Sequence, residues 1–205
     1  MVLALLLLLA APAADRPRLP PVDRCASAPG FTAFREELLG VVARKDVERL
    51  LALSDENIML SFGGDFGREA MRKMWELDRP AGSLIWQELG EALKLGCAMS
   101  EGGAVVPSMA TTLPANEDAF EVMIAVKPGP LRAAPNDRAR AIATLDWDLV
   151  SIGEWDPDNR WARIRLRDGR TGYVRTDAVR SPIDYRAIFE RKDGKWKMRA
   201  FVAGD

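Results

Sequence analysis

Apolar residues between positions 31 and 95 recur at steps of three and four, which is the spacing of one face of an α-helix. Phe31, Phe34 and Leu38 show this pattern most clearly, with charged residues between them. The pattern predicts helices over 31–42, 47–53, 68–77 and 84–95, and a short strand over 58–62. We expect Asp46 and Asp65 to cap the second and third helices, because a carboxylate there accepts hydrogen bonds from the free N–H groups of the first turn.

The pattern changes after residue 119 to the alternation that is typical of half-buried strands. Short runs predict strands over 120–126, 141–145, 148–154, 161–167 and 171–174. In the fourth run, Ala162, Ile164 and Leu166 alternate with Trp161 and three arginines. Asp168-Gly169 then predicts a tight hairpin turn, since glycine adopts positive φ without strain.

The C-terminal segment 182–205 predicts a second hairpin, whose strands alternate on either side of Asp193-Gly194. A two-stranded hairpin alone is only marginally stable in water, so we expect this one to pack on the N-terminal region. The chain then divides into a mainly helical N-terminal region (15–125), an inserted strand-rich region (126–181) and this hairpin. The expected fold class is α+β.

Residues 1–14 have the pattern of a secretory signal peptide. An unbroken apolar run, Leu3–Ala10, precedes the small residues Ala11-Pro12-Ala13, and polar Asp15 follows. Cleavage after this segment predicts export to the periplasm or secretion. No later run reaches the roughly 18 apolar residues that a membrane-spanning helix needs, so we expect no transmembrane segment after cleavage.

Charge and composition narrow the range of partners and catalytic mechanisms that the chain can have. The chain has 29 Lys plus Arg against 30 Asp plus Glu, a net charge of −1, and no histidine. This balance argues against nucleic acid as a partner, because neutralising phosphates requires a basic excess. Without histidine, the Ser-His-Asp and Cys-His mechanisms and His-ligated zinc are excluded. No motif indicates a cofactor or a metal site.

Cys25 and Cys97 are the two cysteines of the chain. Export would place them in an oxidising compartment, where one intramolecular pairing is possible. We therefore predict a Cys25–Cys97 disulfide, which would stabilise the fold by roughly 4 kcal/mol for a loop of this length. The alternative is a pair of unbonded, buried cysteines.

The run from Trp161 to Val174 reads W-A-R-I-R-L-R-D-G-R-T-G-Y-V and resembles the bacterial SH3 (SH3b) domain. It matches the pattern W-x-x-[IV]-x-L-x-D-G-x-x-G-[YW]-V in full. Weaker matches lie at 142–145, at 150–152 and at 129–135, where the usual Asn and Gly are missing from Leu131–Pro135. The resemblance implies an SH3-like small β-barrel over 126–181, of a kind that often targets proteins to cell-wall or protein ligands.

A second resemblance joins the two ends of the chain. The segment 53–62, preceded by two predicted helices and followed by a glycine turn and a third helix, is similar to the opening of NTF2-like domains. The closing segment 189–198 is similar to their last hairpin. This resemblance implies a cone-shaped α+β domain in which the barrel is an insertion.

Aromatic and cationic residues of the strand-rich region are the candidate ligand-binding residues, because rings and guanidinium groups together bind peptides or glycans. They are Trp155, Trp161, Arg163, Arg165 and Tyr173, with Arg167 on the same strand face. In the alternative interpretation, Trp161 packs against an edge of the barrel and the arginines only solubilise a strand.

Catalytic chemistry has weaker support. Carboxylates that could serve a glycosidase or another acid–base reaction are Glu36, Glu37, Asp65, Glu69, Glu88 and Glu91, but each lies where a solvated helix face or a cap would place it. The glycine-rich segment 61–67 lacks the residues of a phosphate-binding loop. The sequence therefore favours an exported, non-enzymatic binding or targeting protein with peptidoglycan or an envelope protein as partner. The alternative is an envelope enzyme with an acid–base pocket in an NTF2-like N-terminal region.

Overall fold

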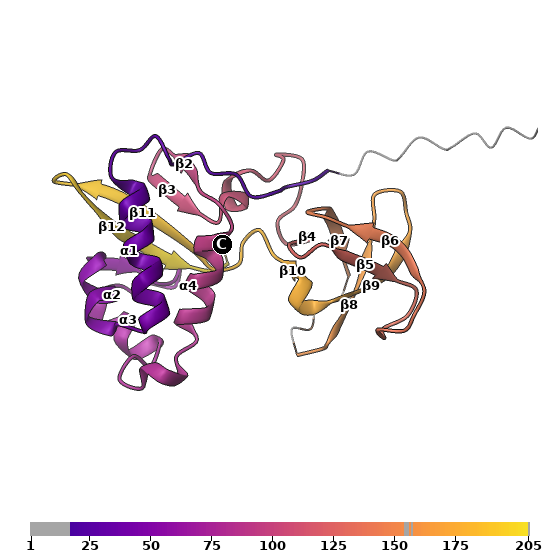
Figure 1. Ribbon diagram of the computed structural model, residues 1–205, viewed down its shortest axis with the longest axis horizontal. Coiled ribbons are helices and arrows are strands. Elements are labelled where there is room, and N and C mark those ends of the chain that lie inside the picture. Colours follow the sequence, from indigo (N-terminus) through magenta and orange to yellow (C-terminus); the bar gives the residue numbers. More distant parts are fainter. Residues whose placement is uncertain (1–16, 154–155, 157, 205) are drawn as a thin grey trace, which may run out of the picture.

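The computed structural model describes residues 17–153, 156 and 158–204. The fold is α+β, as predicted, with four α-helices and two sheets of mostly antiparallel strands in the described residues. Figure 1 shows two units side by side: a helical unit with the first sheet, and a strand unit with the second. The predicted signal peptide and the candidate residue Trp155 lie outside the described residues.

The helices form where the three- and four-residue spacing predicted them. They are α1 (Phe31–Arg44), α2 (Val47–Leu53), α3 (Arg68–Met74) and α4 (Ile85–Lys94), and a short 3-10 helix, η1 (Pro80–Gly82), precedes α4. Asp46 caps α2 as predicted, because its side chain accepts a hydrogen bond from the Arg49 N–H. The prediction for Asp65 is wrong: Gly67 is the N-cap of α3, and the Asp65 carboxylate instead accepts a hydrogen bond from the Ser61 hydroxyl at 2.6 Å.

The first sheet has the strand order β1-β12-β11-β3-β2. Its strands are β1 (Ser54–Met59), β2 (Ala98–Ser100), β3 (Gly103–Val106), β11 (Arg186–Lys192) and β12 (Lys195–Val202). The C-terminal hairpin, β11 and β12, is therefore central: β12 pairs in parallel with β1, and β11 pairs antiparallel with β3. The expected strand over 58–62 is corrected, because β1 begins four residues earlier, at Ser54.

Large side chains from the helices and the first sheet fill the space between them. Phe31 of α1 packs edge-on against Phe189 of β11 and Trp196 of β12, with ring centroids 5.5 and 5.0 Å apart. Phe34 and Leu38, from the same helix face, are also buried. The apolar face predicted for α1 is thus the face that covers the hairpin, and it stabilises a pair of strands that would be marginal alone.

The second sheet has the strand order β10-β4-β7-β8-β9-β5-β6. Its strands are β4 (Val122–Ala125), β5 (Gly129–Arg132), β6 (Ala141–Leu145), β7 (Leu149–Ile152), β8 (Trp161–Arg165), β9 (Thr171–Arg175) and β10 (Val179–Arg180), with the 3-10 helix η3 (Thr176–Ala178) before β10. β4, which the sequence placed at the end of the N-terminal region, belongs to this sheet. No pairing joins the edge strands β10 and β6 in the described residues, so the sheet is open rather than a closed barrel.

The segment that precedes α1 forms backbone hydrogen bonds with both units. Its first part lies along the strand unit, where the Leu19 N–H donates to the Trp147 carbonyl and the Leu149 N–H donates to the Pro17 carbonyl, both at 2.8 Å. Its second part lies along the helical unit, where the Cys97 N–H donates to the Val22 carbonyl at 2.7 Å. Figure 1 shows this segment crossing from one unit to the other.

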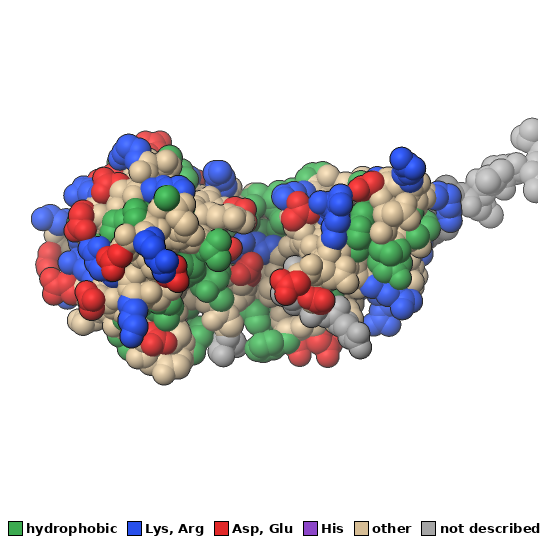
Figure 2. Space-filling view, turned by 90° about the horizontal axis from the view of Figure 1, so that it is seen from below, with side chains coloured by type: hydrophobic (Ala, Val, Ile, Leu, Met, Phe, Trp, Pro, Cys, Tyr) green, Lys and Arg blue, Asp and Glu red, His purple; other side chains and the backbone are tan. Residues whose placement is uncertain are grey.

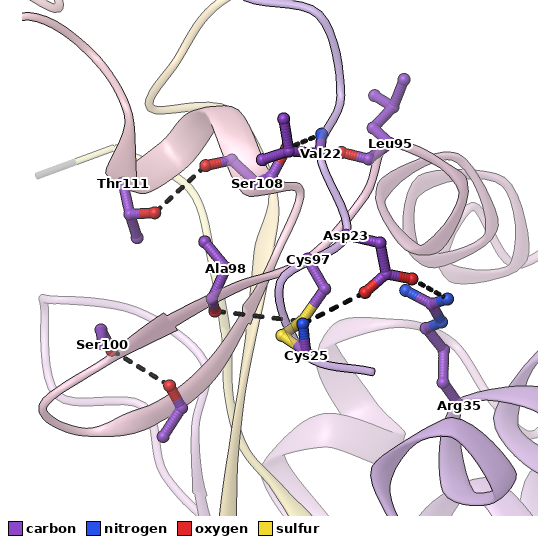
Figure 3. Close-up of a disulfide and its surroundings, with 11 residues drawn as sticks. Val22, Asp23, Cys25, Arg35, Leu95, Cys97, Ala98, Ser100, Ser108 and Thr111 are labelled. Atoms are coloured by element: carbon purple, nitrogen blue, oxygen red, sulfur yellow. Dashed lines mark hydrogen bonds and ion pairs between the residues drawn. A yellow bond between two sulfur atoms is a disulfide. The ribbon is translucent and has the colours of Figure 1, made fainter. Parts of the chain in front are cut away.

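The predicted disulfide is present. Cys25 and Cys97 are bonded, with their Cα atoms 5.7 Å apart and both side chains fully buried. Figure 3 shows the bond beside Asp23, whose carboxylate accepts from the Cys25 N–H at 3.2 Å and forms an ion pair with Arg35 of α1. The disulfide thus joins the segment before α1 to the chain that leaves α4. None of the helices in the described residues combines the length and the apolar character that a membrane-spanning segment requires.

Candidate functional site

The candidate site lies on the outer face of β7, β8 and β9. β8 and β9 form the hairpin that the motif predicted, turning at Asp168-Gly169, where Gly169 has a φ of 84°. Ala162, Ile164 and Leu166 are buried as the alternation predicted. The intervening side chains of β8 therefore lie on the opposite face, which is open to solvent.

Glycine at position 172 allows β9 to approach β5. A Cβ atom built there would lie 2.7 Å from the Arg132 carbonyl oxygen and 2.8 Å from the Leu131 side chain, which is closer than real Cβ contacts allow. The following residue, Tyr173, is paired with Arg132 on one side and with Arg163 on the other. Gly172 therefore lets β9 lie close to β5, and the next side chain on β9, that of Tyr173, reaches the candidate site.

Four of the predicted residues line one groove of about 600 Å³ on this face. They are Trp161, Arg163 and Arg165 from β8 and Tyr173 from β9. Cross-strand pairing places Arg163 opposite Tyr173, and Arg165 lies between Thr171 and Ser151 of the neighbouring strands. The fifth predicted residue, Trp155, falls outside the described residues.

Trp161 forms a wall between two pockets. Besides the groove, its half-buried ring lines a second pocket of about 300 Å³, which Pro130 and Asp177 also line. The Arg175 guanidinium lies over the ring, with its carbon 5.7 Å from the ring centroid, which is within the range of a cation–π contact. Arg175 was missed from the sequence, although its alternation with Tyr173 on β9 would have placed it on this face.

The arginines of the face differ in their partners. Arg167 continues the alternation and is exposed, but it forms an ion pair with Glu117, whose side chain is only 8% exposed, and it does not line the groove. Arg170 is paired with Asp168, which raises the pKa of its guanidinium. Arg163 and Arg165 are exposed and have no ion pair within the part of the chain that the structure describes. They are the basic groups of the groove that a ligand can engage.

In the view of Figure 2, acidic and basic side chains are interspersed over both units. Among the carboxylates considered for catalysis, Glu37 is paired with Arg49, and Glu88 is half-buried with a raised pKa because burial disfavours its charged form. No group of three or more His, Cys, Asp or Glu side chains in the described residues could hold a metal ion.

Comparison of the chain with protein-family models, with curated proteins and with solved structures finds no match. The site is therefore interpreted from its own residues and geometry.

Proposed function

We propose that this is an exported, non-enzymatic binding protein that uses the β7–β9 groove to hold a ligand of the cell envelope. The observation that carries the proposal is the meeting, in one groove, of the rings of Trp161 and Tyr173 with the guanidinium groups of Arg163 and Arg165. Aromatic rings supply rigid apolar contact area, and an arginine without an internal partner binds carboxylates in a bidentate manner.

The resemblance to SH3b domains supports this proposal. The fully matched motif from Trp161 to Val174 falls on β8, the turn and β9, and both of these strands line the groove. We assign an SH3-like fold to residues 126–181 on this basis, and we assign an NTF2-like fold to the helical unit. The position of the C-terminal hairpin between β1 and β3 supports the second assignment, because it closes the sheet that the N-terminal segments begin.

The proposed location is the periplasm or the extracellular medium. Two observations support it: the N-terminal apolar run followed by small residues, and the buried disulfide between Cys25 and Cys97. Disulfides persist in oxidising compartments and are rare where thiols are kept reduced.

Peptidoglycan is the partner that fits the groove best, because it combines sugar rings, which stack on aromatic side chains, with peptides that carry carboxylates. The test is co-sedimentation of the chain from residue 15 to residue 205 with purified peptidoglycan. We expect saturable binding that weakens at least tenfold in a Trp161→Ala, Tyr173→Ala double variant and in an Arg163→Ala, Arg165→Ala double variant.

Arg138→Ala is the matched control, because Arg138 is an exposed arginine of the same unit that lies outside the groove. It should leave binding unchanged, and circular dichroism should show every variant folded. Absence of binding, or equal binding by the folded groove variants, would contradict peptidoglycan as the ligand of this groove. An acidic segment of an envelope protein would then be the next partner to examine.

The alternative, an envelope enzyme with an acid–base pocket in the helical unit, is less well supported. The space between helices and first sheet is filled by buried aromatic and aliphatic side chains, among them Phe31, Phe189 and Phe201. Glu88, on α4, is half-buried and is not among the side chains that fill this core.

A further inference from the structure

Another pocket, of about 410 Å³, opens on the helical unit, far along the chain from the β7–β9 groove. It lies between the end of α3, the start of α4 and the segment that leads into β11. We call it the Trp75–Tyr185 pocket; its lining residues are Met74, Trp75, Glu76, Gly82, Ser83, Leu84 and Tyr185.

The pocket has aromatic walls and an apolar rim. The rings of Trp75 and Tyr185 meet edge-on with their centroids 5.0 Å apart, and Tyr185 stacks on the buried ring of Phe201 at 5.1 Å. Leu84 and Met74, at the rim, are 66% and 43% exposed, which is unusual for large apolar side chains. These residues offer a surface to which alkyl groups can bind.

The electrostatic environment is acidic. Glu88 lies one helical turn after Leu84 on the same face of α4, and its backbone N–H donates to the Leu84 carbonyl. Its side chain is half-buried, and its carboxylate makes no hydrogen bond or ion pair in the part of the chain that the structure describes. Glu88 and Asp184 are both close enough to Tyr185 to raise the pKa of its hydroxyl, after burial as the main cause.

The nearby arginines form ion pairs of their own, although the buried Nε of Arg180 has no hydrogen-bond partner in the described residues. Arg180 forms an ion pair with Asp184 at 3.3 Å and donates to the Tyr185 carbonyl at 2.7 Å. Arg79 is paired with Glu76 at 3.2 Å. Arg180 is close enough to lower the pKa of Glu88, but no cation contacts the Glu88 carboxylate in the described residues.

Trp75, which lines the pocket, also carries an unpaired donor. The indole N–H of Trp75 is buried and has no hydrogen-bond partner in the described residues, although the side chain is only 7% exposed. A buried donor without an acceptor is costly, but this nitrogen has almost no accessible surface, so an acceptor in the pocket reaches it only if the Trp75 side chain shifts.

We propose that the Trp75–Tyr185 pocket binds a small organic ammonium ion, with the rings and the apolar rim around its alkyl groups and Glu88 as its counter-ion. Aromatic rings beside carboxylates are the arrangement that recognises alkylated ammonium groups, because the faces of the rings attract the cation while the surroundings exclude water. This site is independent of the β7–β9 groove.

The test uses choline, which carries a trimethylammonium group and a hydroxyl, and its uncharged isostere 3,3-dimethylbutan-1-ol. Protein labelled with ¹⁵N-tryptophan gives a separate indole signal for Trp75, assigned with a Trp75→Phe variant. We expect choline to shift this signal saturably and the neutral isostere to bind at least about fivefold more weakly, which is the size of one exposed cation–π contact.

Two variants locate the site. Glu88→Gln removes the charge but keeps the shape, and Leu84→Ala removes an exposed rim residue without disturbing the core; each should weaken choline binding by about fivefold or more. Glu91→Gln is the control, because Glu91 is an exposed carboxylate on the same helix. No saturable shift, equal binding of the isostere, or unchanged affinity in both folded variants would overturn the proposal. None of these outcomes depends on whether the chain binds peptidoglycan.

Discussion

Arg175 and Trp161 face each other across the β8–β9 hairpin, with the guanidinium carbon of Arg175 5.7 Å from the centroid of the Trp161 ring. The two residues are direct cross-strand partners. Arg175 is also within 3.5 Å of the Asp177 carboxylate and 3.7 Å of the Asp137 carboxylate, so two anions hold it over the ring. These contacts hold the Trp161 ring in place as one wall of the groove.

We expect Arg175→Ala to destabilise the chain by about 1 kcal/mol, the size of a cation–π contact at a partly exposed site. Arg175→Lys should lose part of this stabilisation despite keeping the charge, because the planar guanidinium stacks on a ring and an ammonium group does not. Urea unfolding followed by circular dichroism would measure both changes. Equal stability of the wild type and Arg175→Ala would contradict a stabilising contact between Arg175 and the Trp161 ring.

Removing the disulfide should cost about 2–5 kcal/mol, the range for a native bridge. The Cys25→Ser, Cys97→Ser double variant tests this, since Cys25 and Cys97 are fully buried and joined across a sequence separation of 72 residues. Calorimetry should show a lower melting temperature for the variant, and a reducing agent should lower that of the wild type but not that of the variant. An unchanged melting temperature in reducing agent would contradict the prediction.

Local periodicity explains what could be predicted of the fold. The helices, the β8–β9 hairpin and the C-terminal hairpin are each encoded by spacing within one segment, as the buried positions Ala162, Ile164 and Leu166 illustrate. β1 was placed too late because its residues are mostly polar: Asp55, Glu56 and Asn57 occupy an edge strand, with little apolar alternation to reveal it.

Long-range pairing explains what could not be predicted. The proline-containing segment before α1 has no periodicity, and its partners at 147–149 lie more than 120 residues away. Alternation on β8 grouped Arg167 with Arg163 and Arg165, but Glu117 engages Arg167 from a segment 50 residues away that has no regular pattern. Trp75 and Tyr185, which line the same pocket, are similarly 110 positions apart in the sequence, so spacing within a segment could not indicate that they meet.

The segment before α1 should contribute to stability through Leu19. This side chain is half-buried and packs on a cluster that includes Ile124 and Leu149 of the second sheet. We expect Leu19→Ala to cost roughly 1–2 kcal/mol in urea unfolding, since partial burial of a leucine contributes about this much. Arg24→Ala is the control, because Arg24 lies in the same segment and is exposed. Equal effects of the two substitutions would show that the packing of Leu19 contributes nothing.

Glu88→Gln should make the fold more stable at neutral pH. The pKa of Glu88 is raised, first by burial and then by the negative charge of Asp184 and Glu91, while Arg180 lowers it. A raised folded-state pKa means that the ionised form destabilises the fold, and this cost is present above the folded-state pKa. The variant should therefore melt at a higher temperature than the wild type at pH 7. The difference should disappear below the ordinary value of 4.5, where Glu88 is protonated in both folded and unfolded chains.

Measurement of melting temperature from pH 3 to pH 8 tests the sign of this effect. Glu91→Gln removes a carboxylate from the same helix and should show a smaller difference at pH 7, since Glu91 is exposed. A destabilised Glu88→Gln variant at pH 7 would mean that the ionised carboxylate makes a favourable contact, and it would contradict the prediction.

Gly172→Ala should disrupt the support of the groove. The added methyl group would lie 2.7 Å from the backbone oxygen of Arg132, so β9 and β5 would have to separate by a few tenths of an ångström or more. Overpacking of this kind typically costs about 1–3 kcal/mol, and moving β9 also moves Tyr173. Urea unfolding should show the loss, and peptidoglycan binding by the protein that remains folded should weaken. Gly102→Ala is the matched control, since a Cβ there meets no atom within 4 Å. Equal losses of stability in Gly172→Ala and Gly102→Ala would show that the close approach of β9 to β5 at Gly172 does not position Tyr173.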